Sequence, residues 1–323
     1  MIGFRLIWEG DEMEFPGKSW RSAAPEDLGL DAAALQRAAA DVFEIEKRYG
    51  FLVVKDGVIV HETYKRDASA TNRIFSLTKG FGATLIGAAQ QQGLLHADDL
   101  ISDWLPVHHP EIMEGAQIRH VLSMTAGKEP VGSWWAYNSN EILNTLPGIL
   151  WLASGKSPHA FYSEHIKAPV GFDFDWPHNE RGWVQIGSQG PLPVIQATHH
   201  DIARLGHLWL NGGKWNDTQV LDPDFVKEAL TPQFPKANGA YGYLWWLNSG
   251  QGTWRSTGGR SGEGRWFSDA PANLFLGLGA RGKVLVVVPD HNLVVVTMGE
   301  TPQEQSGNYL ARIVNAVLSI FPG

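Results

Sequence analysis

Apolar residues near the start of the chain follow first a helical and then a strand-like period. Between Leu28 and Glu46 they recur at helical spacing, which predicts an amphipathic helix. Two β-branched runs, Phe51 to Val54 and Val58 to Val60, then flank Lys55-Asp56-Gly57. Because an Asp-Gly pair between such runs is a strong hairpin signal, an antiparallel strand pair is expected after the helix.

The C-terminal part carries the same elements in the opposite order. Lys283 to Val288 and Leu293 to Met298 flank Pro289-Asp290-His291-Asn292, which predicts a second hairpin. From about Pro302 to Phe321 apolar residues again recur at helical spacing, so the chain is expected to end in an amphipathic helix.

The middle of the chain is typical of helices joined by loops rich in glycine and proline. The expected helices are Ser76 to Leu95, Ile118 to Met124, Glu141 to Ala153, Pro158 to Ile166, His200 to Asn211 and Asp222 to Leu230. The simplest assembly is an α+β fold, with one antiparallel sheet from both termini, flanked by N- and C-terminal helices, and an inserted all-helical domain. We expect residues 1–68 and 235–323 in the sheet domain, 69–234 in the helical domain, and an active site in the cleft between them.

Composition and charge narrow the class of protein. Of 323 residues, 43% are hydrophobic and 19% are charged, which is a globular composition with ample core. The net charge of −8 and the lack of a long basic run argue against a nucleic-acid partner. The chain has no cysteine, so disulfides, thiolate zinc sites and a cysteine nucleophile are excluded.

Neither a membrane span nor a signal peptide is predicted. The longest apolar tract, Val284 to Met298, is interrupted by Pro289 to Asn292 and is too short to cross a bilayer. The apolar stretch Ile2 to Trp8 contains Arg5 and lacks the long apolar centre and the small-residue cleavage site of a signal. We expect a cytoplasmic protein, and an exported form whose signal has been removed is the alternative.

The first candidate for chemistry is Ser76-Leu77-Thr78-Lys79. On a helix the two polar side chains would share one face, with Cβ atoms roughly 5–6 Å apart. A lysine there can accept the proton of the serine or stabilise its alkoxide, as in S-x-x-K acyl-transfer enzymes. In the alternative reading, Ser76 only caps the helix and Lys79 is a solvated surface residue.

Two further segments could complete such a site. Tyr137, in the loop before the helix from Glu141, is placed to relay protons, although an aromatic packing cluster would look the same. The glycines between Leu276 and Lys283 could let a substrate approach a strand edge, where a backbone N–H could complete an oxyanion hole with that of Ser76. At least one of these glycines could instead serve only a turn.

Together these segments resemble the serine β-lactamase and penicillin-binding protein superfamily, specifically its class C-like branch, which includes esterases and 6-aminohexanoate-dimer hydrolases. The resemblance runs from about Ser19 to Phe321. Its further landmarks are Val53 to Val60, Arg73 to Leu95, Asp98-Asp99, Trp104-Leu105-Pro106, Ile118 to Gly127, Thr198 to Gly213 and Tyr241 to Trp246.

The resemblance implies a β-lactamase/transpeptidase-like fold and a division of roles. Ser76 would attack the carbonyl, Lys79 would activate it, and Tyr137 would exchange protons with Ser76 and the leaving group. Which of Lys79 and Tyr137 is the base stays open. The backbone N–H groups of Ser76 and Lys283 would form the oxyanion hole, and no metal or organic cofactor is implied.

Two departures from the family pattern bear on the substrate. Ser139 stands where the second motif commonly has asparagine, and Ala280-Arg281-Gly282 aligns where the third motif commonly begins with lysine or histidine. Because a strand would point Arg281 away from the face of Ala280, the usual grip on a substrate carboxylate is weakened. We therefore expect an esterase or amidase acting on a small-molecule substrate. A β-lactamase or a peptidase of the DD-peptidase or D-aminopeptidase type is the alternative, and a non-catalytic ligand-binding member is a second one.

Tryptophans near these motifs could line an apolar acyl pocket, and ordinary core packing is the competing explanation. Trp135, two residues before Tyr137, is the best pocket candidate; the others are Trp134, Trp245, Trp246 and Trp266.

The remaining sequence patterns are weak evidence of a functional site. His108-His109 and His199-His200-Asp201 lack the spacing of a metal motif, and Asp201 fits a helix start capped by Thr198. Gly155-Lys156-Ser157 lacks the earlier glycine of a phosphate loop, and Gly259 to Glu263 lacks the last glycine of G-x-S-x-G. The oligomeric state has no signal in the sequence.

Overall fold

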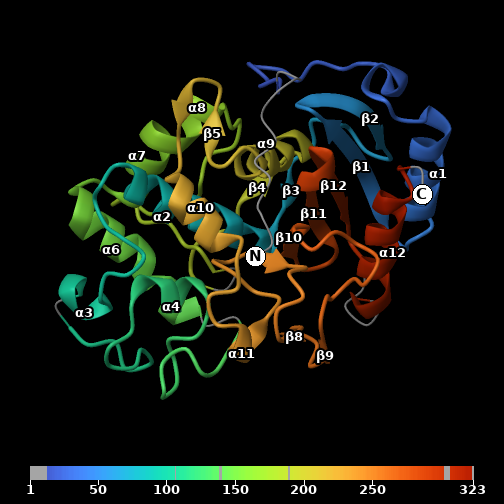
Figure 1. Cartoon of the computed structure of the whole chain (residues 1–323). Helices are drawn as coiled ribbons and strands as arrows, with labels where there is room; N and C mark the ends of the chain where they lie inside the picture. Colours follow the sequence, from blue (N-terminus) through green and yellow to red (C-terminus); the bar gives the residue numbers. More distant parts are fainter. Residues whose placement is uncertain (1–12, 106, 138–139, 188–189, 302–305, 322–323) are drawn as a thin grey trace.

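The computed structural model describes residues 13–105, 107–137, 140–187, 190–301 and 306–321. Its centre is a six-stranded antiparallel sheet in the order β2-β1-β12-β11-β10-β7, which joins both ends of the chain (Figure 1). The strands are β1 (Arg48–Lys55), β2 (Val58–Tyr64), β7 (Trp246–Leu247), β10 (Phe275–Gly279), β11 (Lys283–Val288) and β12 (Leu293–Gly299).

Both predicted hairpins are confirmed. Lys55 pairs with Val58 across Asp56 and Gly57, whose φ angles of 52° and 84° are those of a tight two-residue turn. In the second hairpin Val288 pairs with Leu293 around η4 (Pro289–His291). The two hairpins pair with each other through β1 and β12, in a register that places Leu52 opposite Val296. The two ends of the chain therefore form one sheet, as expected.

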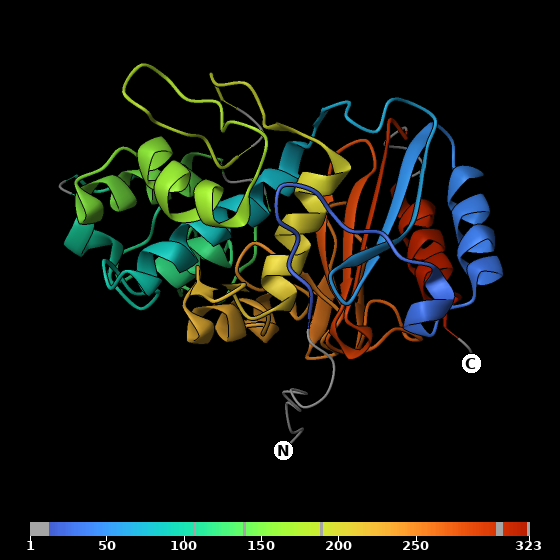
Figure 2. The same ribbon diagram turned by 90° about the horizontal axis from the view of Figure 1, so that it is seen from above.

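Helices cover both faces of this sheet (Figure 2). The terminal helices α1 (Ala32–Phe43) and α12 (Ser306–Leu318) pack together on one face, and α9 (His199–Leu210) packs against β11 and β12 on the other. The first helix starts later than its apolar pattern suggests, because Gly29 adopts a left-handed conformation after η1 (Pro25–Leu28) and Asp31 caps Ala33. Helix α9, from the middle of the chain, therefore covers one face of the sheet.

The start of α9 confirms the capping expected from its sequence. The Thr198 hydroxyl accepts a hydrogen bond from the N–H of Asp201, and the Asp201 carboxylate accepts one from the N–H of Thr198. This reciprocal arrangement is a capping box, so the carboxylate of Asp201 is engaged in capping the helix.

The remaining helices gather beside the sheet around α2 (Thr78–Gln91) (Figure 1). Every residue of α2 from Thr78 to Gln90 is buried. Its glycines permit this, since a Cβ on Gly82 would lie 2.5 Å from Cγ2 of Ile186 and one on Gly87 would lie 2.8 Å from Cδ1 of Phe225. The helix expected over this segment is confirmed, and its small residues let neighbours pack closely.

Shorter elements complete the helical part and the loops. The helical ones are η2 (Phe75–Leu77), α3 (Ile101–Trp104), α4 (Ile118–Leu122), α5 (Asn140–Leu143), α6 (Thr145–Ser154), α7 (Pro158–Tyr162), the π-helical η3 (Ser163–Lys167), α8 (Ala168–Val170), α10 (Pro223–Ala229) and α11 (Pro235–Asn238). Three two-stranded ribbons pair β3 (Asn72–Arg73) with β4 (Gln196–Ala197), β5 (Lys214–Trp215) with β6 (Thr218–Gln219), and β8 (Thr253–Arg255) with β9 (Ser261–Glu263). Within the described ranges, no helix is long and apolar enough to cross a membrane.

Candidate active site

Ser76 lies in η2, directly before α2 and beside strand β10 of the sheet. Lys79, one turn later, donates a hydrogen bond from its Nζ to the Oγ of Ser76 at 3.3 Å. The serine and the lysine therefore meet as the i, i+3 spacing predicts. Since the first backbone N–H groups of a helix have no carbonyl partner within it, the N–H of Ser76 is placed to donate to a ligand.

The environment of Lys79 contradicts the purely structural reading of this segment. Only 2% of its surface is exposed, and burial lowers the pKa of its amine from 10.5 to about 7. The cap of α2 is Leu77, which makes no side-chain capping bond. The alternative in which Ser76 caps the helix and Lys79 is solvated is therefore wrong for this structure.

Tyr137 completes the group from the loop before α5. Its hydroxyl is hydrogen-bonded to Ser76 and to Nε1–H of Trp246, and the Nζ of Lys79 lies 4.8 Å from the centroid of its ring. Burial raises the pKa of the Tyr137 hydroxyl to about 12, against the effect of these two hydrogen bonds. Near neutral pH the phenol therefore keeps its proton.

A wall of aromatic rings stands next to Tyr137. The ring of Trp135 lies 5.8 Å from those of both Tyr137 and Trp246, and Tyr241 packs edge-on against Trp246 at 4.9 Å. Trp266 extends the wall, at 5.2 Å from Trp246. Nε1 of Trp135 and the hydroxyl of Tyr241 are buried and have no hydrogen-bond partner among the described residues. Trp246 and Tyr241 are buried, so the surface that this wall exposes comes from the half-buried Trp135 and Trp266.

The other two candidate tryptophans lie elsewhere. Trp245 is fully buried between Trp209 and Phe275, which is ordinary core packing. Trp134 is 55% exposed, with the Nζ of Lys128 lying 4.2 Å from its ring. Of the proposed substrate-binding residues, Ser139 lies outside the described part of the chain.

Strand β10 presents a free edge near Ser76. Among the residues that the structure describes, it pairs with β7 only at Phe275 and Leu276, and Gly277 to Gly279 have no strand partner on that side. A Cβ on Gly279 would lie 2.1 Å from the carbonyl oxygen of Ile74, two residues before Ser76. Glycine is therefore required here so that the strand can approach the serine segment.

The aligned third motif, Ala280-Arg281-Gly282, is a turn and not a strand. It joins β10 to β11, and Arg281 and Gly282 have positive φ angles of 59° and 78°. The strand geometry that should turn Arg281 away from the site therefore does not apply. Arg281 pairs with Glu300, and its guanidinium lies 5.8 Å from the ring centroid of Phe75.

Lys283 is buried behind this turn. Its ammonium donates to the carbonyl of Gly299 and pairs with Glu300 at 2.8 Å, and its side chain is completely inaccessible. Residue 283 begins an interior strand, opposite Gly279 of β10. Because backbone groups of an interior strand point along the sheet toward neighbouring strands, Lys283 is poorly placed to complete an oxyanion hole. The free edge of β10 is better placed.

Arg48 also supports the β10–β11 turn, from the interior of the protein, and it was not predicted from the sequence. Only 2% exposed, it donates to the carbonyl of Gly282 and, at 2.9 Å, to the hydroxyl of Thr297. Burial lowers the pKa of its guanidinium to about 10. The available signal was a charged residue at the start of the apolar run before Phe51, but its partner lies 234 residues away.

Phe75, directly before Ser76, has an unusual backbone. Its φ of 49° is left-handed, which for a residue with a side chain costs on the order of 1 kcal/mol. Three cations surround its ring: Arg73, Arg281 and Lys283, at 5.2, 5.8 and 5.4 Å from the centroid. Cation–π attraction can help to hold this conformation and, with it, the orientation of Ser76.

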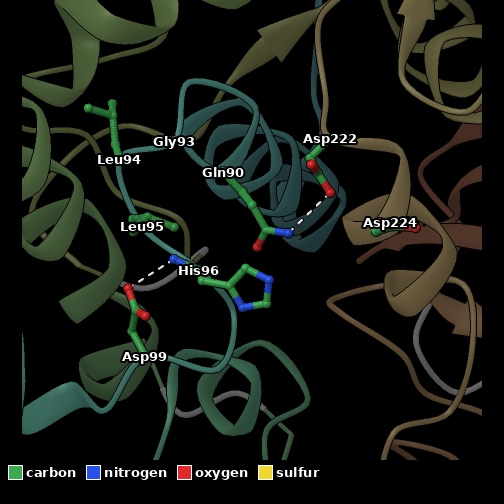
Figure 3. A pocket seen from close by; sticks show the side chains of 8 residues that line it. All are labelled: Gln90, Gly93, Leu94, Leu95, His96, Asp99, Asp222 and Asp224. Carbon is green, nitrogen blue, oxygen red and sulfur yellow. Dashed lines mark hydrogen bonds between the residues drawn. The ribbon is translucent and has the colours of Figure 1, made fainter.

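A shallow hollow of about 440 Å³ lies at the other end of α2 (Figure 3). Gln90, in its wall, is 11 residues after Lys79, or about 16 Å along the helix. Gln90 donates to Asp222 and accepts from the N–H of Ala97, and Asp99 accepts from the N–H of His96. These side chains serve the local structure, so the hollow adds nothing to the group around Ser76.

Comparison with known proteins gives the family. The model of the Beta-lactamase family matches residues 45–318, and the chain belongs to this family. An uncharacterized protein of Alkalihalophilus pseudofirmus is 24% identical over 302 residues, which are 81% of this chain and 87% of the relative.

Solved structures show the same fold. A proposed 6-aminohexanoate-dimer hydrolase from Bacillus anthracis has a TM-score of 0.70 and 18% identity, over 97% of this chain and 92% of that one. EstCE1, a hydrolase with promiscuous acyltransferase activity, has a TM-score of 0.64 and 15% identity, over 91% and 99% of the two chains. The β-lactamase/transpeptidase-like fold expected from the sequence is confirmed.

Proposed function

We propose that the protein is a serine hydrolase that cleaves a carboxylic ester or amide through a covalent acyl-enzyme on Ser76. The observation that carries this proposal is the buried amine of Lys79 at 3.3 Å from the Ser76 Oγ. An amine with a pKa near 7 is a base of suitable strength for neutral pH, and its Nζ lies within hydrogen-bond reach of the hydroxyl that it would deprotonate.

Acylation follows from these positions. Lys79 takes the proton of Ser76 as Oγ forms a bond to the substrate carbonyl carbon. When the bond to the leaving group breaks, Tyr137 donates its hydroxyl proton to that group and recovers a proton from the ammonium of Lys79, whose Nζ lies 4.8 Å from the centroid of its ring. Because burial raises the pKa of Tyr137 to about 12, we assign the base role to Lys79 and the donor role to Tyr137.

The oxyanion of the tetrahedral intermediate needs two N–H donors. We assign one to Ser76, at the start of its helix, and the second to the free edge of β10 or its continuation, between Gly277 and Ala280. The close approach of Gly279 to Ile74 supports this choice over Lys283. Water then attacks the acyl carbon, with Lys79 as base, and Ser76 regains its proton.

The aromatic wall supports an apolar substrate. Trp135, Tyr241 and Trp246 surround Tyr137, which would protonate the leaving group. An ester or amide with an apolar or aromatic group on that side would cover the wall.

A substrate panel tests this proposal. Initial rates are measured on p-nitrophenyl acetate, butyrate and benzoate, on linear amide oligomers and D-amino-acid amides, and on nitrocefin. We expect ester hydrolysis that exceeds nitrocefin hydrolysis and that disappears in Ser76→Ala. Efficient nitrocefin turnover without activity on short esters would contradict the proposed substrate class.

Arg281 and Arg73 favour a second candidate function. Their guanidiniums lie near the ring of Phe75, one residue from Ser76, and could bind a substrate carboxylate as penicillins and peptide C-termini require. A β-lactamase or carboxypeptidase-like activity would then fall strongly in Arg281→Ala, whereas hydrolysis of a neutral ester would not.

A further inference from the structure

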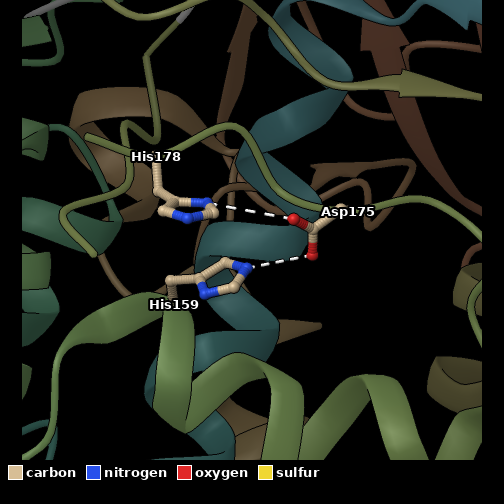
Figure 4. A group of neighbouring side chains, drawn as sticks. All are labelled: His159, Asp175 and His178. Carbon is tan, nitrogen blue, oxygen red and sulfur yellow. Dashed lines mark hydrogen bonds and ion pairs between the residues drawn. The ribbon is translucent and has the colours of Figure 1, made fainter. Parts of the chain in front are cut away.

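Three metal-ligating side chains meet on the helical part of the molecule, apart from the group around Ser76 (Figure 4). His159 comes from the first turn of α7, and Asp175 and His178 come from the loop after α8. One ligand atom of each lies within 4.8 Å of those of the other two. Nε2 of His159 is 2.9 Å from Oδ1 of Asp175, and Nδ1 of His178 is 3.9 Å from Oδ2.

We propose that His159, Asp175 and His178 form a binding site for a divalent transition metal of the zinc class. Zinc binds imidazole nitrogen and carboxylate oxygen at about 2.0–2.2 Å, so its tetrahedral ligands are about 3.4 Å apart. The ligand atoms of the three residues lie within 4.8 Å of one another, and small side-chain movements would bring them to that separation. Two imidazoles with one carboxylate favour zinc, copper or nickel over magnesium and calcium, which prefer oxygen ligands.

The surroundings support this ligand set. The rings of His159 and His178 are stacked with centroids 3.6 Å apart, which places the two imidazoles on the same side of Asp175 (Figure 4). The carbonyl of Trp176 lies 3.0 Å from Nδ1 of His178 and accepts its N–H, which leaves Nε2 as the ligand nitrogen, as outer partners of metal-bound histidines commonly do.

Lys167 is the natural competitor of the metal. Its Nζ lies 3.4 Å from Oδ1 of Asp175, where it neutralises the carboxylate. A bound cation would displace this ammonium, which is 30% exposed and can move into solvent. Removal of Lys167 should therefore strengthen metal binding, which a simple ion-pair cluster would not predict.

The metal would tie two segments that support α2. His159 begins α7, and the loop carrying Asp175 and His178 continues to Ile186. Ile186 fills the space above Gly82 of α2, the helix that carries Lys79. Cross-linking this loop to α7 would stabilise the folded protein, since a ligand that binds only the folded state raises its stability.

Calorimetric titration of the full chain tests the site. The protein is treated with EDTA, desalted and titrated with zinc sulfate at pH 7.5, with magnesium chloride in parallel. We expect one zinc per chain, no comparable magnesium binding and a rise in the melting temperature with zinc. His178→Ala should weaken this binding at least tenfold, and Lys167→Gln should tighten it.

The double variant His108→Ala/His109→Ala is the matched control, because it removes an adjacent histidine pair elsewhere on the helical part. We expect it to bind zinc as the wild type does. Equal zinc affinity in wild type and His178→Ala, loss of the site in the control, or weakened binding in Lys167→Gln would overturn the proposal. Circular dichroism of each variant establishes that it is folded, and Lys167→Gln leaves all three ligands in place.

Discussion

Replacing Lys79 by methionine should stabilise the protein while abolishing its activity. The side chain is 2% exposed, and its pKa falls from 10.5 to about 7 because burial disfavours the charged amine. Each pKa unit is worth about 1.4 kcal/mol, so holding this lysine in the folded state at pH 7 costs about 4 kcal/mol. Methionine fills similar space without that cost but loses the hydrogen bond to Ser76, worth about 1 kcal/mol. We expect the free energy of unfolding at pH 7 to rise by about 3 kcal/mol.

The pH dependence identifies the cause of this gain. Between about pH 7 and 10.5 the unfolded wild type binds one more proton than the folded protein, at residue 79. Wild-type stability therefore rises with pH over this window, relative to the variant. The difference between the two proteins should be largest at and below pH 7 and should shrink to about 1 kcal/mol at pH 9.

Urea unfolding followed by circular dichroism at pH 6, 7, 8 and 9 measures this difference. Lys227→Met, at an exposed position on α10, is the control and should show no comparable gain. A destabilised Lys79→Met variant at pH 7, or a gain that stays constant from pH 6 to 9, would refute the assignment of a buried amine with a lowered pKa.

The other predictions concern the rate and the β10–β11 turn. The kcat/KM for an ester should rise about tenfold per pH unit up to about pH 7, where Lys79 loses its proton, and then stay level; a fall above pH 7 would contradict Lys79 as the base. Gly279→Ala should lower kcat about 100-fold, because its Cβ would meet the carbonyl of Ile74 at 2.1 Å, whereas Gly258→Ala, with no atom closer than 4.0 Å, should not. Arg48→Met leaves the carbonyl of Gly282 unpaired and should lower kcat about tenfold with little change in KM; unchanged kcat would show that the turn needs no such support.

The contact between Ser76 and Lys79 could be predicted because it is local. Their separation of three residues fixes it once the segment is helical, and a helix was expected from Ser76 to Leu95. Tyr137 could be placed only through the resemblance to a family, since its contact with Ser76 spans 61 residues. The spacing of a single sequence gives no information on such long-range contacts.

The third segment shows where sequence patterns are insufficient. The apolar run after Lys283 indicated a strand. The end of the preceding turn could not be located from the sequence, because it depends on the register of the hairpin, in which Lys283 faces Gly279. A shift of a few residues moves the proposed N–H donor from β11 to the free edge of β10. Arg48 and Gly282 could not be paired in advance, because they meet only after both ends of the chain join one sheet.

The most direct measurement is to trap and locate the acyl group. The protein is mixed with excess p-nitrophenyl butyrate, quenched in acid within the first turnovers, digested and analysed by mass spectrometry. We predict a butyryl group on Ser76 in the wild type, and neither the adduct nor ester turnover in Ser76→Ala. An acyl group on another residue, or turnover that survives in Ser76→Ala, would contradict the assignment of Ser76 as the nucleophile.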